Sequence, residues 1–265
     1  MYCSKKRFIS SEEVVKTKMA KDNFSAQSKS YASFRPVFPD ALYKFIISNV
    51  NEFDLVWDVA TGNGQSAIKL APYFKNVFAT DISNNQLDHA TQLPNVVYKN
   101  EPAEHSTLAD QSVNLISISQ AIHWFQFDTF YKEVKRVAKQ GAIIAAFCYS
   151  ILNIENEKLN NLLASFYTES QPYWDNERKY IDEKYQTIPF PFEEIAVPGF
   201  SMQYEWSMHQ LIGYLETWSA NQHYLKLFGT SLVNNDFKKL LSEYWPTKET
   251  LCVQFPVSMR IGRIK

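Results

Sequence analysis

Short apolar runs alternate with amphipathic stretches along the first half of the chain. Runs with the composition of buried strands lie at 55–59, 77–81, 96–98, 113–119 and 142–149. Helical periodicity occurs at 40–50, around 67–71, at 86–91 and at 130–138. Strands that are apolar on both faces and alternate with helices are typical of a parallel sheet that is covered on both sides. The pattern predicts a doubly wound α/β fold, which binds ligands at the carboxyl ends of its strands.

The alternation stops after residue 150. Residues 151–186 favour helix, and three prolines at 189–198 mark a loop. A strand is expected at 201–206, helices are expected at 210–219 and 236–245, and a closing strand is expected at 251–265. Pro256 within this closing strand indicates an edge position or a bulge, because proline cannot donate a backbone hydrogen bond.

Composition and charge exclude several classes of protein. The chain has 265 residues, 45% of them hydrophobic, with 27 Lys and Arg against 28 Asp and Glu. This balance argues against a nucleic-acid-binding protein, and the longest apolar run is too short for a membrane span. The five histidines are scattered without the spacing of metal ligands. Three distant cysteines form no disulfide framework, so a cytoplasmic location is expected.

Two glycines lie where the first predicted strand passes into the first helix. Gly62 and Gly64 would let the backbone approach a ligand, and the free N–H groups of the next helix favour an anion. Asp81 ends the second strand 19 residues after Gly62, where a carboxylate accepts hydrogen bonds from ribose hydroxyls. This combination predicts an adenosine-type cofactor. The alternative is a plain tight turn with Asp81 as a helix N-cap, a role that Ser83 would serve equally well.

The residues around the glycine turn also bear on which cofactor binds. The segment 62–67 formally matches the dinucleotide pattern of NAD(P) enzymes. However, Asp58 ends the first strand, and its carboxylate would repel a pyrophosphate while attracting an ammonium group. S-adenosylmethionine carries an ammonium group together with an adenosine. Asp58 therefore favours S-adenosylmethionine over NAD(P).

At this point a family resemblance is clear. The segment Asp58-Val59-Ala60-Thr61-Gly62-Asn63-Gly64 resembles the first motif of class I S-adenosylmethionine-dependent methyltransferases, with Ala60 in place of the first glycine. Further segments resemble later family motifs in the expected order, namely 81–83, 102–104, 119–125 and 136–141. The resemblance covers residues 24–150 and is closest to small-molecule enzymes of the type-11 and trans-aconitate-methyltransferase-like kind.

The resemblance implies a mostly parallel seven-stranded sheet with an antiparallel closing strand and a helical insertion. It divides the chain into an N-terminal extension at 1–22, an S-adenosylmethionine-binding core at 23–150, and an insertion with the last strands of the same domain at 151–265. The cofactor implied is S-adenosylmethionine, and its product is S-adenosylhomocysteine. The residues implied to hold the cofactor are Tyr31, Arg35, Asp58, Ala60, Gly62, Gly64, Asp81, Ile82, Ala103, Glu104 and Gln120.

Each of these residues has an implied place. Asp58 and the two glycines would hold the methionyl end, Asp81 the ribose, and Ile82 and the Ala103 N–H the adenine. Pro102 replaces an aspartate that is common in the family, which leaves open whether Glu104 or Glu101 substitutes for it. Tyr31 and Arg35 would fold over the cofactor. Arg35 could instead tie the N-terminal segment to the sheet.

On the substrate side, His123 and Trp124 follow the fourth strand. His123 is a candidate catalytic base, and Trp124 a candidate wall of the acceptor pocket. The alternative is that the His123 ring only positions the loop through hydrogen bonds.

We therefore expect methyl transfer to an oxygen of a small molecule, either a carboxylic acid or a hydroxyl. The competing readings are an NAD(P)-dependent oxidoreductase and a non-catalytic S-adenosylmethionine-binding module.

Overall fold

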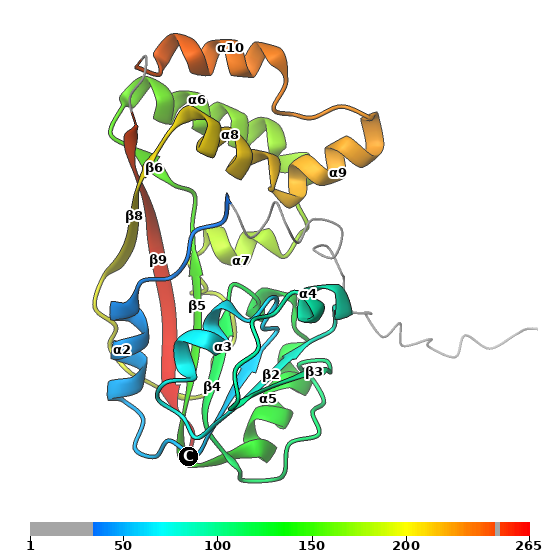
Figure 1. The fold of residues 1–265 in the computed structure, drawn as a ribbon, viewed down its shortest axis with the longest axis vertical. Helices are drawn as coiled ribbons and strands as arrows, with labels where there is room; N and C mark the ends of the chain where they lie inside the picture. Colours follow the sequence, from blue (N-terminus) through cyan, green and yellow to red (C-terminus); the bar gives the residue numbers. More distant parts are fainter. Residues whose placement is uncertain (1–33, 247–249) are drawn as a thin grey trace, which may run out of the picture.

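The fold is built around one mixed sheet, shown in Figure 1 in a computed structural model that describes residues 34–246 and 250–265. Its parallel strands are β1 (Leu55–Val59), β2 (Asn76–Asp81), β3 (Val96–Asn100), β4 (Val113–Ser119) and β5 (Ala138–Tyr149). Strand β9 (Leu251–Arg263) runs antiparallel beside β5. Its other pairing partners are β6 (Asn153–Ile154), β7 (Glu193–Glu194) and β8 (Phe200–Trp206). The order β3-β2-β1-β4-β5-β9-β6 confirms the predicted mostly parallel sheet with an antiparallel closing strand.

Helices cover both faces of the parallel strands. On one face lie α2 (Asp40–Ser48) and α3 (Gln65–Leu70), whose buried Leu42 and Leu70 pack with Val56 of β1. On the other face lies α5 (Phe127–Val137), whose Phe130 packs with Trp57 of the same strand. Since β1 lies between β2 and β4, the chain reverses its direction of winding at β1, and a crevice is expected at the carboxyl ends of β1 and β4.

The second half of the chain adds a group of helices to this sheet. They are α6 (Glu157–Ser170), η3 (Gln171–Tyr173), α7 (Arg178–Asp182), α8 (Met208–Glu216), α9 (Ser219–Phe228) and α10 (Asn235–Tyr244). In Figure 1, α6, α8, α9 and α10 gather at one end of the molecule, and α7 lies between them and the parallel strands. In 34–246 and 250–265, no helix has the length and apolar composition needed to cross a membrane. The predicted extension at 1–22 lies outside the described residues.

Strand β9 lies inside the sheet, between β5 and β8, so the prediction of an edge position from Pro256 is wrong. The carbonyl of Pro256 accepts a hydrogen bond of 3.0 Å from the Ser150 N–H, immediately after the last residue of β5. The donor that proline lacks therefore falls where the pairing of β5 with β9 ends, and no ladder bond is lost within the strand.

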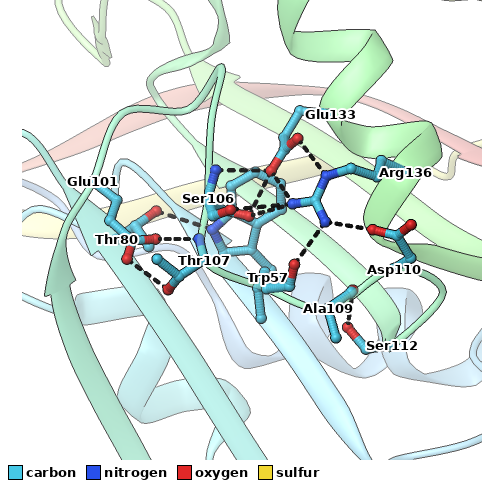
Figure 2. Close-up of polar contacts among 11 residues, drawn as sticks. Trp57, Thr80, Glu101, Ser106, Thr107, Ala109, Asp110, Ser112, Glu133 and Arg136 are labelled. Carbon is cyan, nitrogen blue, oxygen red and sulfur yellow. Dashed lines mark hydrogen bonds and ion pairs between the residues drawn. The ribbon is translucent and has the colours of Figure 1, made fainter.

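A buried polar network ties α5 to the loop between β3 and β4 (Figure 2). The Oε1 atom of Glu133, a side chain only 6% exposed, accepts hydrogen bonds of 2.7 Å from both the N–H and the hydroxyl of Ser106. Arg136 donates to both carboxylate oxygens of Glu133, at 2.6 and 2.9 Å. Nearby, the Glu101 carboxylate accepts from the N–H and hydroxyl of Thr107. These bonds fix a loop that carries predicted cofactor-binding residues.

Removing the carboxylate from this network is expected to destabilise the fold. Glu133→Ala removes the acceptor of the Ser106 N–H and hydroxyl and leaves Arg136 with only Asp110 and the Leu108 and Ser106 carbonyls as partners. We therefore expect the free energy of unfolding in urea to fall by about 2–4 kcal/mol. Lys75→Ala is the control, because the ion pair between Lys75 and Asp54 lies at the surface and should contribute less than about 1 kcal/mol. Equal losses in the two variants would contradict this role of Glu133.

Candidate functional site

The turn between β1 and α3 has an unusual backbone. Ala60, Gly62 and Gly64 all lie in the left-handed region, with φ of 52°, 58° and 84°. Ala60 thus keeps the conformation that the family's first glycine supplies freely, at a cost of about 1–2 kcal/mol for a residue with a Cβ. A Cβ on Gly64 would overlap the hydroxyl of Tyr98, whereas a Cβ on Gly62 would lie 4.0 Å from the nearest atom, on Gln86. A side chain at position 64 would therefore have to displace the end of the Tyr98 side chain, whereas Gly62 leaves space open for a ligand.

Asp58 lies beneath this turn and is fully buried. Its Oδ2 accepts a hydrogen bond of 2.5 Å from the Thr61 hydroxyl, while its Oδ1 has no hydrogen-bond partner within the described residues. Burial raises the pKa of Asp58 to about 7, although the bond from Thr61 acts against this shift. A buried carboxyl with an unpaired oxygen favours a cation nearby.

Asp81 connects the end of β2 to the turn. Its Oδ2 accepts a hydrogen bond of 2.8 Å from the Gly62 N–H, and its Oδ1 accepts one of 2.9 Å from the Ser83 N–H. The N-cap of α4 (Asn84–Asp88) is Ser83, whose hydroxyl accepts from the Gln86 N–H. Because Ser83 fills the capping role, the helix does not require Asp81, which stands at the mouth of the turn with its carboxylate toward a cavity.

This cavity has a volume of about 210 Å³. The predicted site residues that line it are Arg35, Ala60, Gly62, Asp81, Ile82, Ala103, Glu104, Gln120, His123 and Trp124. Asp58 and Gly64 do not line it, because one lies beneath the turn and the other faces Tyr98. Tyr31 is outside the described residues. The structure thus brings most of the predicted residues to one place.

The side of the cavity that Ile82 and Ala103 line combines apolar and polar groups. Ile82 is 38% exposed, which leaves apolar surface for a flat ring. Ala103 is buried in the loop held by Glu133 and Arg136. The two carboxylates that could substitute for the missing aspartate also make internal bonds: Glu104 accepts from the Gln126 N–H at 2.8 Å, and Glu101 holds the loop through Thr107.

Residues of the helical insertion close the other side. Trp174, Asp175, Arg178, Ile181 and Ser219 also line the cavity. The sequence motifs did not identify these positions. Trp174 ends η3 in an extended conformation and Arg178 begins α7, so helical periodicity could not have paired the two side chains.

His123 is held where the core meets the insertion. It is only 4% exposed, and its Nδ1 lies 3.0 Å from the hydroxyl of Tyr185. Burial, with a further contribution from the positive charge of Arg178, lowers the pKa of His123 to about 3. The ring is therefore neutral at physiological pH and is a weak base.

Two other predicted residues make bonds that order the site. The side-chain Oε1 of Gln120 accepts a hydrogen bond of 2.9 Å from the Tyr149 N–H. Arg35 donates to the Tyr149 hydroxyl at 3.1 Å and to the Thr217 carbonyl at 2.8 Å. These bonds support the reading in which Arg35 ties its segment to the sheet and the insertion.

Comparison with known proteins identifies the class that this fold and cavity define. The family model Methyltransf_11, a methyltransferase domain, matches residues 57–146. A Dictyostelium discoideum protein that is provisionally named a methyltransferase is 33% identical over 91% of this chain and 95% of its own. A structure from Anaeromyxobacter dehalogenans, provisionally described as a type II methyltransferase, has a TM-score of 0.79 and 32% identity over 87% of this chain and 98% of its own. The malonyl-[acyl-carrier protein] O-methyltransferase of a Marinomonas species is 34% identical over 46% of this chain and 47% of its own.

The protein is a class I S-adenosylmethionine-dependent methyltransferase. Within that class, the chain belongs to the Methyltransf_11 family. This membership decides against an NAD(P)-dependent oxidoreductase and against a non-catalytic module. The residues present fit the cofactor, because Gly62 leaves space where a Cβ would stand and the unpaired Asp58 Oδ1 favours the positive charge that the cofactor carries.

Removing the Asp81 carboxylate should weaken cofactor binding strongly. Asp81→Ala would remove the predicted acceptor for the ribose and would also release the Gly62 N–H, and hydrogen bonds to a charged group contribute about 1.5–3 kcal/mol. We expect the dissociation constant of S-adenosylhomocysteine, measured by calorimetry, to rise about 10- to 100-fold. Asp88→Ala, an exposed aspartate on α4, is the control. An unchanged constant in the Asp81 variant would place the ribose elsewhere.

The buried His123 should also change how the free energy of unfolding depends on pH. Below about pH 6.5 the unfolded chain protonates this histidine, whereas the folded protein does so only near its pKa of about 3. Because His123 stays neutral in the folded protein, the free energy of unfolding decreases as the pH falls from about 6.5 toward 3, by up to about 1.4 kcal/mol per pH unit.

Asp58 has the opposite effect on stability. Its pKa is raised to about 7, so the folded protein binds this proton before the unfolded chain does, and Asp58 adds stability as the pH falls. The comparison of wild type with His123→Asn in urea at pH 6.5, 5.5 and 4.5 separates the two groups, because Asp58 is common to both proteins. We expect a smaller loss of stability toward low pH in the variant. Parallel curves would show that His123 is accessible to protons in the folded state.

Proposed function

We propose that this enzyme transfers a methyl group to an oxygen atom of a small acid, with a carboxylate as the acceptor group. The observation that carries the proposal is the state of His123. It lines the cavity on the acceptor side, yet it is buried, neutral and weakly basic. A hydroxyl acceptor must lose a proton during transfer and benefits from a base poised near neutral pH. A carboxylate is already ionised, so this site matches its requirements.

The residues of this chain would act by binding and orientation. Asp81, Ile82, Ala103 and the turn at Gly62 would hold S-adenosylmethionine, with Asp58 beneath the turn favouring its positive charge. When bound, this cofactor supplies a methyl group whose transfer forms a C–O bond, breaks the C–S bond and leaves the electron pair on sulfur. His123 and Trp124 would shape the acceptor side and exclude water, and positioning of this kind supplies much of the rate in many enzymes.

A relative supports an oxygen acceptor. The Marinomonas protein is named for O-methylation of a malonyl group on an acyl carrier protein. Its similarity to this chain covers under half of each protein, so it supports the type of acceptor atom and not the identity of the substrate.

A screen with S-adenosylmethionine and matched small acids, phenols and amines tests the proposal. We expect S-adenosylhomocysteine to form with acids, and the product to be a methyl ester that alkaline hydrolysis releases as methanol. Turnover with amines or phenols and none with acids would contradict the proposal.

The same assay tests the role of His123. If the ring positions the acceptor, His123→Asn should lower kcat by less than about 100-fold, with the affinity for S-adenosylhomocysteine nearly unchanged. Between pH 5.5 and 7.5, the wild-type kcat should show no limb that His123→Asn lacks, because the pKa of His123 lies near 3, and any limb from Asp58, whose pKa is about 7, is common to both proteins. A limb near pH 6.5 that the variant lacks, with a larger loss of kcat in a stably folded protein, would establish His123 as a base.

A further inference from the structure

Arg178 stands out among the residues that the insertion contributes to the cavity. It is the first residue of α7, its side chain is 15% exposed, and it lines the cavity together with Trp174 and Ile181. It is also close enough to the acceptor side for its charge to affect His123. A positive charge is therefore held beside the place where the acceptor would bind, on an element outside the cofactor-binding motifs.

The contacts of Arg178 fix its guanidinium group without using its outer end. Its Nε lies 3.2 Å from both the Tyr167 hydroxyl and Asp182 Oδ1. The guanidinium carbon lies 4.5 Å from the centre of the Trp174 ring. Within residues 34–246 and 250–265, these hydrogen bonds involve Nε alone, and no acceptor is bonded to Nη1 or Nη2. The plane of the group is set, and its two terminal nitrogens remain available to a ligand.

Arg35, the other arginine that lines the cavity, is arranged differently. Both of its terminal nitrogens donate to the protein, one to the Tyr149 hydroxyl and one to the Thr217 carbonyl. Its charge also lies over the ring of Tyr214. Arg35 therefore joins parts of the protein, whereas the geometry of Arg178 is that of a group prepared for a planar anion. An arginine fork matches the two oxygens of a carboxylate.

We propose that Arg178 is the specificity-determining residue that binds the carboxylate of the methyl acceptor, with Trp174 holding the guanidinium plane. This inference rests on the proposed function and names the residue that selects its substrate class. It also predicts discrimination between substrate and product, because a methyl ester carries no charge for Arg178 to pair with. An acid should bind, and the ester derived from it should dissociate.

The test uses the full-length protein saturated with S-adenosylhomocysteine and titrated with phenylacetate or octanoate, each paired with its methyl ester. In the wild type, we expect at least one acid to bind about 10-fold or more tightly than its ester. Arg178→Gln should weaken binding of that acid about 10- to 100-fold and abolish the preference over the ester, with an unchanged affinity for S-adenosylhomocysteine. Lys179→Gln is the matched control, since it removes the same charge from an exposed neighbour on α7.

Two more variants distinguish a loss of carboxylate binding from a general effect of the substitution on folding. Arg178→Lys keeps the charge but loses the fork, and should retain part of the preference for the acid. Asp182→Asn removes the negative charge that faces Arg178 and should tighten binding of the acid. A preference that survives in a folded Arg178→Gln protein, or that is absent from a wild type that binds S-adenosylhomocysteine normally, would overturn the role of Arg178. A wild type that fails to bind S-adenosylhomocysteine would overturn the proposed function as well.

Discussion

The left-handed turn after β1 is the constraint on which the rest of the site depends. It bends the chain sharply enough for the N–H of Gly62 to reach the Asp81 carboxylate, so the ends of β1 and β2 are joined at one point. Thr61 turns inward to Asp58, which places a buried carboxyl directly under the bend. A residue that could not adopt positive φ would separate these groups, and the turn would no longer form this wall of the cavity. The backbone strain at Ala60 is thus offset by the contacts that the turn makes possible.

The helices after β5 complete a site that the core leaves half open. The contact between His123 and Tyr185 fastens the segment after β4 to the insertion, and the bonds from Arg35 to Tyr149 and Thr217 do the same at the end of β5. The parallel strands and their turns therefore provide the features common to the family. Arg178, which is proposed to bind the acceptor, comes from the helices after β5, outside the residues 57–146 that the family model matches.

The sequence predicted the parallel sheet because its strands are buried on both faces and appear as continuous apolar runs. It did not predict α9, where Leu225, Leu227 and Phe228 are exposed and the apolar residues do not form a single buried face. Nor could the pattern place Pro256, whose tolerance inside the sheet depends on where β5 ends. Local periodicity carries information on the elements, whereas strand order and lateral neighbours depend on contacts between distant parts of the chain.

In the candidate site, too, local sequence motifs indicate some residues, whereas others depend on contacts between distant parts of the chain. Motif spacing predicts that Gly62 and Asp81 hold the cofactor, and both line the cavity, since their positions follow from the geometry of a strand followed by a helix. It also predicts that Asp58 and Gly64 hold the methionyl end of the cofactor; neither lines the cavity, because Asp58 lies beneath the turn and Gly64 faces Tyr98. Arg178 was missed because it begins a short helix, α7, separate from η3 and Trp174, and its neighbouring sequence does not distinguish it from a surface arginine. Its significance comes from the cavity that a separate part of the fold creates.

Charged side chains of both signs line the cavity. Asp81 lies at the end where the cofactor is proposed to bind, with Asp58 buried beneath the turn, while Arg178 lies with Asp175 at the end formed by the insertion. A cationic methyl donor and an anionic acceptor would each be drawn to the end that complements it, which orients both without a base or a metal ion having to touch the acceptor. Transfer to a carboxylate would then cancel both charges at once, since it yields a neutral thioether group and a neutral ester. The attraction between Arg178 and the acceptor carboxylate would thereby be absent from the ester product. The positions of the charges would thus favour binding of the substrate and release of the product.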